Sequence, residues 1–170
     1  MQRTKWVDRK FNFDFPIGIM PSILERLRGT PARIAEMTAP LTEKQISFRH
    51  GDKWSIKEHI GHLSDLEELH EGRIEDFIVG KQILRPADMT NARTNAASHN
   101  SRNIGELLNE FTEKRQQLVS HLEKLDDTVH EIKSLHPRLQ VVMRPVDMAY
   151  FTAEHDDHHL ASIRELMNAK

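Results

Sequence analysis

The sequence contains no cysteine among its 170 residues. This absence excludes disulfide bonds, thiol catalysis, and zinc or iron–sulfur sites built from cysteine ligands. It is also compatible with a reducing compartment, and we expect a cytoplasmic protein. The sequence has no run of about 18 apolar residues, and no apolar segment follows its charged start, so neither a membrane span nor a signal peptide is predicted.

Charge of one sign is not in excess, because 24 Lys and Arg residues stand against 26 Asp and Glu residues. A nucleic-acid-binding surface requires clustered basic residues, so no nucleic-acid partner is expected. Aromatic residues are scarce at 6%, whereas charged residues make up 29%, as in a helical protein with solvated faces. A chain of this length is most economically one domain, residues 1–170. Histidine is the unusual component, with 11 copies.

Apolar residues recur at helical spacing in four stretches of the chain. Pro21 stands where a helix tolerates proline, but Gly29-Thr30-Pro31 is predicted to break that first helix into two segments. Ser55 and Glu58 have the spacing of a capping box at the start of the second predicted helix. The predicted helices cover residues 20–37, 55–79, 103–125 and 145–168.

The connections between these helices are long, and none has the pattern of a convincing sheet. Residues 1–17 are predicted to form an extended arm whose aromatic side chains dock on the body. Residues 81–102 are polar and without a period, so we expect a crossover or one wall of a binding pocket. The predicted fold is all-α, a four-helix bundle with long crossover connections.

Three histidines lie on the last predicted helix. His155 and His159 are one turn apart, about 40° on the helical wheel, and share a face with apolar residues such as Phe151. His158 lies to one side, nearer solvent. The second predicted helix carries His59, His62 and His70 within or beside its own apolar stripe, and periodicity does not choose among them.

Imidazoles that meet in an apolar interior need partners for their nitrogen atoms, because an unpaired buried polar group costs about 1–3 kcal/mol. One divalent metal satisfies three nitrogens, and three histidines plus water form an open, catalytic type of zinc site. Nickel would also accept this set, and ferrous iron is possible. The alternative is a metal-free bundle with hydrogen-bonded histidines. The remaining histidines are interpreted as ordinary surface residues: His50, His99, His121, His130 and His136.

Charged residues near these histidines have two interpretations each. Asp65, one turn beyond His62, is a candidate for orienting a ligating ring. Glu154 is another, whereas Asp156 and Asp157 fit a solvated helix face better. Arg73 fits an ordinary ion pair, with an anionic substrate as the alternative.

Two segments together resemble the signatures of the DinB/YfiT-like superfamily. Residues 54–65, WSIKEHIGHLSD, match the form W-S-x-x-E-x-x-x-H-L-x-D, and residues 155–163, HDDHHLASI, match H-x-x-x-H-L-x-x-I. Their order and their separation match as well, so the resemblance covers most of the chain.

The resemblance implies a bundle with an up-up-down-down path and a divalent metal held by His62, His155 and His159, with His59 not used as a ligand. It also implies a homodimer, because members of the superfamily are often homodimers. It implies a small-molecule substrate, because characterised relatives include thiol-dependent transferases using bacillithiol or mycothiol and a mycothiol-dependent isomerase. We therefore expect a metal-dependent enzyme, a hydrolase or thiol S-transferase, whose metal activates water or a low-molecular-weight thiol. The alternative is a non-catalytic metal-binding helical module with a stress-response or binding role. No catalytic residue is assigned from the sequence.

Overall fold

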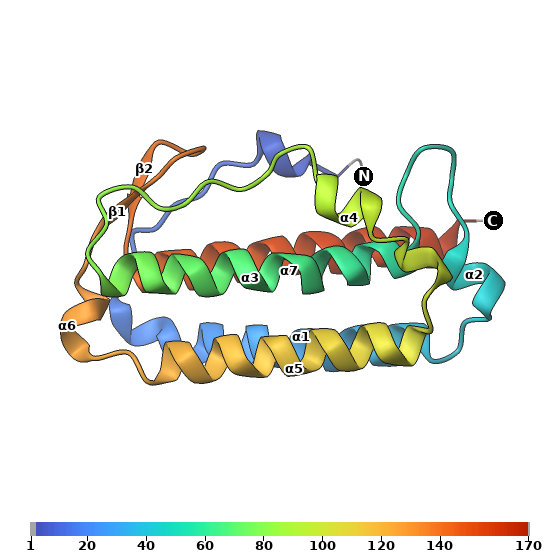
Figure 1. Ribbon diagram of the computed structural model, residues 1–170, viewed down its shortest axis with the longest axis horizontal. Coiled ribbons are helices and arrows are strands. Elements are labelled where there is room, and N and C mark those ends of the chain that lie inside the picture. The colour runs from blue at the N-terminus through green and yellow to red at the C-terminus, as the bar shows by residue number, and fades with distance from the viewer. Residues whose placement is uncertain (1–2, 170) are drawn as a thin grey trace.

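Four long helices form a bundle in the computed structural model, which describes residues 3–169 (Figure 1). α1 and α7 run in one direction along the bundle, and α3 and α5 run in the other (Figure 1). The predicted all-α four-helix bundle is confirmed. None of the helices described is long and apolar enough to cross a membrane. The bounds are Met20–Thr38 for α1, Ile56–Ile78 for α3, Ile104–Glu123 for α5 and Pro145–Asn168 for α7.

The directions of the helices follow the chain order up, down, down, up, which differs from the predicted up-up-down-down path (Figure 1). The physical reason lies in the connections. Only the segment between α3 and α5 returns along the whole bundle, whereas the segments before α3 and after α5 join helix ends on the same side (Figure 1). The long polar segment 81–102 is thus the crossover that the sequence predicted.

The connections contain short elements that the sequence did not specify. Strands β1 and β2 form an antiparallel hairpin in which Leu135 lies opposite Val142. The prediction of no sheet was wrong here, because strands of three residues are too short to show an alternating pattern. The short elements are α2 Glu43–Ser47, α4 Ala92–Ala96, α6 Asp127–His130, β1 Ser134–His136 and β2 Val141–Met143, with 3-10 turns at Trp6–Asp8, Ile17–Ile19 and His99–Ser101.

α1 is continuous through the segment where a break was predicted, with Pro31 inside the helix. Proline has no N–H, so the carbonyl four residues earlier, on Leu27, has no helical donor. The buried Arg115 supplies one, with Nη1 donating to that oxygen at 3.2 Å. Thr30 Oγ1 donates to the carbonyl of Arg26 at 3.1 Å. A tertiary hydrogen bond therefore replaces the missing helical one.

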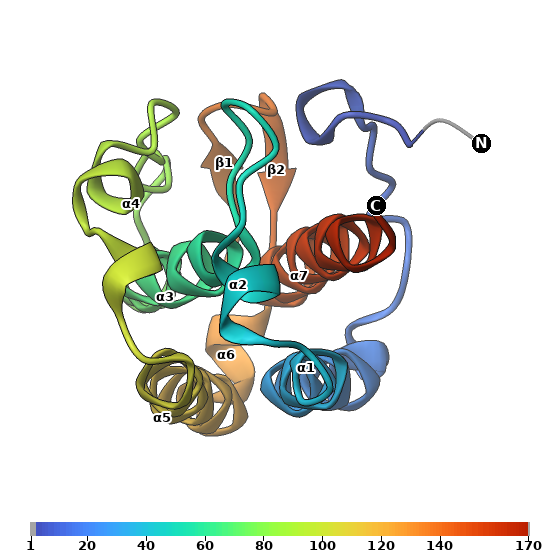
Figure 2. The ribbon, with the colours of Figure 1, turned by 90° about the vertical axis from the view of Figure 1, so that its right-hand side faces the viewer.

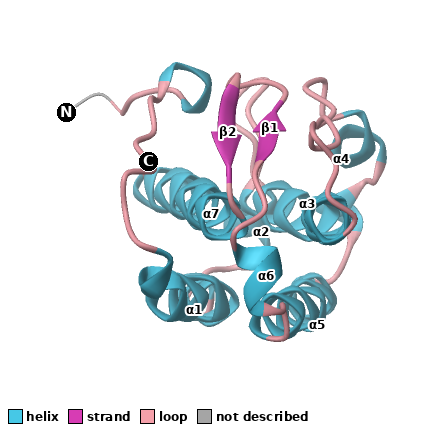
Figure 3. Ribbon diagram, turned by 90° about the vertical axis from the view of Figure 1, so that its left-hand side faces the viewer, coloured by secondary structure: helices cyan, strands magenta, loops and turns pink. Residues whose placement is uncertain are grey.

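The face formed by α3 and α7 is covered by three segments: the N-terminal arm, the β1–β2 hairpin and the crossover with α4 (Figures 2 and 3). The predicted docking of the arm is confirmed, since Trp6 and Phe11 each lie with their rings 5.0 Å from that of Phe151. Phe15 packs against Tyr150 at 5.2 Å. Opposite this face, α1 and α5 close the bundle (Figure 2).

Candidate metal centre

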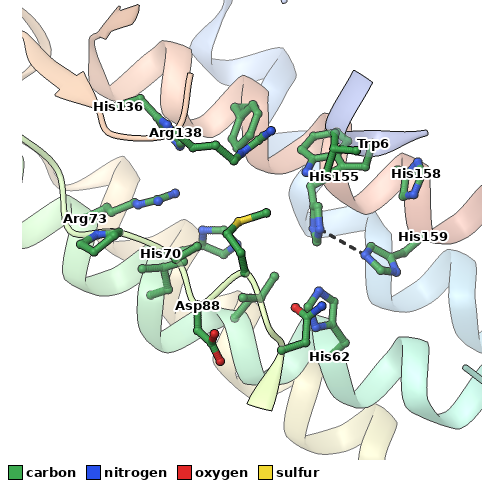
Figure 4. A pocket seen from close by; sticks show the side chains of 18 of the residues that line it. Trp6, His62, His70, Arg73, Asp88, His136, Arg138, His155, His158 and His159 are labelled. Atoms are coloured by element: carbon green, nitrogen blue, oxygen red, sulfur yellow. Dashed lines mark hydrogen bonds between the residues drawn. The ribbon is translucent and has the colours of Figure 1, made fainter. Parts of the chain in front are cut away.

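His62 of α3 meets His155 and His159 of α7 beneath the covering segments (Figure 4). Each of the three side chains offers a nitrogen atom, and these atoms all lie within 4.8 Å of one another. The structure thus brings together the three residues predicted as ligands. The helical pair has ring centroids 4.4 Å apart, as expected for residues one turn apart on the same face.

A chain of hydrogen bonds fixes the proton on His62. The Thr94 hydroxyl donates to Asp65 Oδ2 at 2.9 Å, so it accepts from His62 Nδ1, 3.1 Å away. Asp65 in turn accepts from His99 Nε2 at 2.9 Å. With its proton on Nδ1, His62 has a free lone pair on Nε2, the state that a metal ligand requires. Asp65, predicted to orient the His62 ring, reaches that ring through Thr94 rather than by direct contact.

The two histidines of α7 present the same atom to a common point. His155 Nε2 and His159 Nε2 are 3.1 Å apart. Two nitrogens bound to one tetrahedral zinc would lie about 3.3 Å apart, given Zn–N distances of about 2.0–2.1 Å. His59, an open candidate for third ligand, lies behind His159, with the two Nδ1 atoms 2.8 Å apart. His59 therefore contacts a candidate ligand instead of joining the three nitrogens.

Burial keeps these imidazoles neutral. Desolvation lowers the pKa of His62 to about 4, with Asp65 opposing the shift. Desolvation holds the pKa values of His155 and His159 well below their usual range, and the neighbouring histidines lower these pKa values further. Neutral imidazole is the form that binds metals, so the site is ready to ligate without first losing protons.

Two tryptophans cover the histidine cluster. The Trp6 ring lies 4.9 Å from that of His155. The Trp54 ring lies 4.7 Å from His62, and Trp54 Nε1 donates to Asn95 Oδ1 at 3.2 Å. One aromatic ring comes from the arm and the other from the residue before the cap of α3, so two segments distant in sequence pack over the same site.

A cavity of about 500 Å³ opens beside the cluster and is lined by His62, His155 and His159. The crossover forms one wall, as predicted for the polar segment 81–102, with Pro86 and Met89 among the lining residues. His70, the other open candidate for third ligand, also lines the cavity but stands apart from the cluster (Figure 4). It is buried, and its Nδ1 lies 3.5 Å from Thr152 Oγ1.

Three residues interpreted as surface groups are buried: His99, His136 and Asp156. His99 packs flat on α3 at Gly61, where an added Cβ would lie 2.2 Å from the His99 ring. A glycine inside a helix costs roughly 0.5–1 kcal/mol relative to alanine, so Gly61 was the one sequence signal of this close approach. His136 lacked a signal because it lies in a connection without a period.

Asp156 is paired in the core and does not lie on a solvated face. It accepts from Arg115, which also donates to Glu67 at 2.6 Å. Glu154 accepts from Arg26 at 2.8 Å, and Asp157 also accepts from Arg26 at 2.6 Å. Within residues 3–169, none of these acids bonds to a histidine of the cluster, so the role in orienting a ligand considered for Glu154 is not met.

The sequence and fold match known proteins. Residues 26–163 match the DinB superfamily. The fold is similar to that of YfiT from Bacillus subtilis, described as a probable metal-dependent hydrolase with an unusual four-helix bundle topology. The TM-score is 0.75 at 18% identity, and the match covers 93% of this chain and 91% of YfiT. No curated protein sequence is significantly similar to this chain. Because the family match spans most of its length, the chain belongs to the DinB superfamily.

Proposed function

We propose that this protein is a metal-dependent hydrolase with a divalent metal held by His62, His155 and His159. The observation that carries the proposal is the convergence of three neutral imidazoles at the wall of a cavity of about 500 Å³. A closed structural site would have a fourth protein ligand and no adjoining space. The description of YfiT as a probable metal-dependent hydrolase supports the same activity.

The donor set fits a divalent metal of borderline softness. Three imidazole nitrogens without a thiolate suit zinc or nickel, and ferrous iron also accepts them. A bound metal of this kind supplies a nucleophile by lowering the pKa of its water to about 7. Three protein ligands would leave one position for that water, and the cavity beside the histidines would give a substrate access to it.

The surrounding residues support this chemistry in two ways. Thr94 and Asp65 hold the His62 ring in one tautomer, so its lone pair points to the cluster. Trp6 and Trp54 cover the rings and lower the local dielectric, which strengthens the electrostatic interactions at the site. These contacts position the ligands before any substrate arrives.

Hydrolysis of a panel of activated esters, amides and phosphoesters tests the proposal. Tag-free protein loaded with zinc or nickel is expected to hydrolyse at least one class, and metal-stripped protein or a His155→Gln variant is expected to lose that activity. His121→Gln serves as the matched control, because His121 pairs with Glu71 on another face of the bundle.

The alternatives give different results. Turnover that depends on an added low-molecular-weight thiol would reassign the nucleophile and make the protein a thiol S-transferase. A loaded metal with four protein ligands and no exchangeable water would indicate the non-catalytic metal-binding module. Either result would contradict the hydrolase proposal.

A further inference from the structure

The cavity has a second polar end. Arg73, Arg138 and His136 line it on the side away from His62 and His159, with apolar side chains between the two ends (Figure 4). Arg73 comes from α3, and the other two come from the β1–β2 hairpin and its turn. This group is separate from the candidate metal ligands.

Arg73 is a buried cation to which no carboxylate of residues 3–169 is bonded. Its side chain is 2% exposed, Nε donates to the carbonyl of Arg85 at 3.1 Å, and Nη1 contacts Met148 Sδ at 3.8 Å. The nearby Asp76 carboxylate is bonded to Lys81 and Arg85 instead. Burial lowers the pKa of Arg73 to about 10, against the opposing effect of Asp76. The guanidinium is still charged at neutral pH and lacks a full counter-charge.

His136, which lines the same cavity, adds a buried donor. Its Nδ1 accepts the backbone N–H of Leu139 at 3.2 Å, so neutral His136 carries its proton on Nε2. Burial, with Arg73 and Arg138 acting in the same direction, lowers the pKa of His136 to about 4, so the ring is neutral near pH 7. Nε2 is buried and has no hydrogen-bond partner among residues 3–169.

Arg138 adds a second guanidinium. Its carbon Cζ lies 5.7 Å from the centre of the Phe151 ring, and Nη2 is buried without an acceptor in the described part of the chain. Unpaired buried donors are uncommon, and each costs about 1–3 kcal/mol. Two such donors lie beside a buried arginine that bonds no carboxylate among the described residues, and together they indicate a place built for an acceptor.

The cavity wall offers little negative charge to these groups. Asp88 is the one acidic residue among the described residues that line it. Both Asp88 oxygens accept from the loop that follows, Oδ1 from Thr90 N at 2.8 Å and Oδ2 from Ala92 N at 2.8 Å. Within residues 3–169, no carboxylate of the cavity wall therefore pairs with these arginines.

We propose that Arg73, Arg138 and His136 bind the acid group of the substrate, which is an amphiphilic organic anion. The planar guanidinium of arginine can donate two hydrogen bonds to two oxygens of a carboxylate or phosphate, and the His136 N–H adds a third donor. The apolar part of the molecule lies along Leu66, Leu69 and Phe151, which carry it towards the histidine cluster. Binding of the anion needs no metal, whereas its role as the group that positions a substrate rests on the proposed hydrolase function.

Isothermal titration calorimetry on metal-stripped, full-length protein tests this inference with 4-phenylbutanoate and its uncharged analogue 4-phenylbutanamide. The carboxylate is expected to bind about 10- to 100-fold more tightly than the amide, the range given by charge-assisted hydrogen bonds of about 1.5–3 kcal/mol. Arg138→Gln is expected to remove most of this preference. Arg164→Gln, at an exposed arginine of α7, is expected to keep it.

A second variant tests Arg73, the buried arginine of this group. Arg73→Gln is expected to weaken carboxylate binding as well, and its melting temperature shows whether the helix still folds. The inference is overturned if the carboxylate binds no more tightly than the amide, whether both bind or neither does. It is also overturned if Arg138→Gln keeps the full preference.

The two proposals can fail separately. A His62→Ala variant is expected to lose metal but to retain the preference for the carboxylate, which places the anion away from the histidine cluster. Loss of the preference in that variant would put the anion at the cluster and contradict the inference. If the protein binds the anion but hydrolyses no substrate of the panel, the anion site is supported and the hydrolase function is contradicted.

Discussion

Thr94 connects the His62 ring to Asp65, and so links a candidate metal ligand to a carboxylate. Burial acts to raise the pKa of Asp65, but the hydrogen bonds from His99 and Thr94 outweigh it and lower that pKa. Asp65 is therefore ionised near neutral pH and can only accept hydrogen bonds. That fixes the direction of each bond in the chain from His99 to His62.

Replacing Thr94 with valine keeps the side-chain volume and removes the hydroxyl. We expect Thr94→Val to weaken metal binding about 10- to 100-fold, because His62 loses the bond that fixes its tautomer. Zinc titration in competition with a chromophoric chelator measures the change. Thr112→Val, at a threonine that bonds the Leu108 carbonyl within α5, is the control. Wild-type affinity in the Thr94 variant would show that the chain of bonds does not tune the site.

Sequence patterns located part of the site residue by residue. Helical spacing placed His155 and His159 on one inward face, which the structure confirms by their Nε2 atoms 3.1 Å apart. Spacing did not separate His62 from His59, because both fall near the same stripe of α3. His136 was missed because its burial depends on a hairpin that folds over the bundle, and tertiary contacts of that kind leave no local pattern.

At the scale of elements, α1, α3, α5 and α7 are joined by a buried charge network. Arg115 of α5 donates to Glu67 of α3 and to Asp156 of α7, and its Nη1 reaches the Leu27 carbonyl of α1. Arg115 and Asp156 are each 1% exposed, so solvent does not screen their charges. One side chain thus contacts all four helices and also compensates for Pro31.

Arg115→Met removes the cation and retains an unbranched apolar stem. We expect a loss of about 3–5 kcal/mol in the free energy of unfolding, because Glu67 and Asp156 are left buried without a counter-charge. Urea denaturation followed by circular dichroism measures it. Arg28→Met, at an exposed arginine paired with Glu25 and Glu123, is expected to change stability little. Equal effects of the two variants would mean that the network contributes no more than a surface pair.

Local signals predicted most of the long elements. The reciprocal Ser55–Glu58 bonds begin α3 as the capping box predicted, and Asn103 Oδ1 accepts the Gly105 N–H at 2.8 Å at the start of α5. The break predicted at Pro31 was wrong because a distant arginine supplies the missing donor. Predictions from local sequence describe the conformation that a segment prefers by itself. They do not include hydrogen-bond donors from another helix.

At the scale of the whole molecule, the bundle buries several histidines in their neutral form. Desolvation lowers the pKa of His136 to about 4 and holds that of His70 well below its usual range. In the unfolded chain a histidine has a pKa of about 6.5. Between these values the unfolded state binds protons that the folded state does not, so folding becomes less favourable as the pH falls.

We therefore expect the metal-stripped protein to lose stability as the pH is lowered from about 6.5 to about 4, by up to about 1.4 kcal/mol per pH unit for each such histidine. Urea unfolding at a series of pH values in this window measures the slope. His136→Gln, which cannot take up a proton, is expected to show a shallower slope. A free energy of unfolding that stays constant across the window would contradict the assigned neutral state.

Zinc binding to tag-free, metal-stripped protein tests the central claim most directly. Competition with a chromophoric chelator at neutral pH is expected to give about one equivalent for the wild type, as for a single three-histidine site. We expect the same for His121→Gln and a loss of this binding for His62→Gln, His155→Gln and His159→Gln. Less than about a tenth of an equivalent in the wild type, or full binding in all three histidine variants, would show that the cluster is not a metal centre.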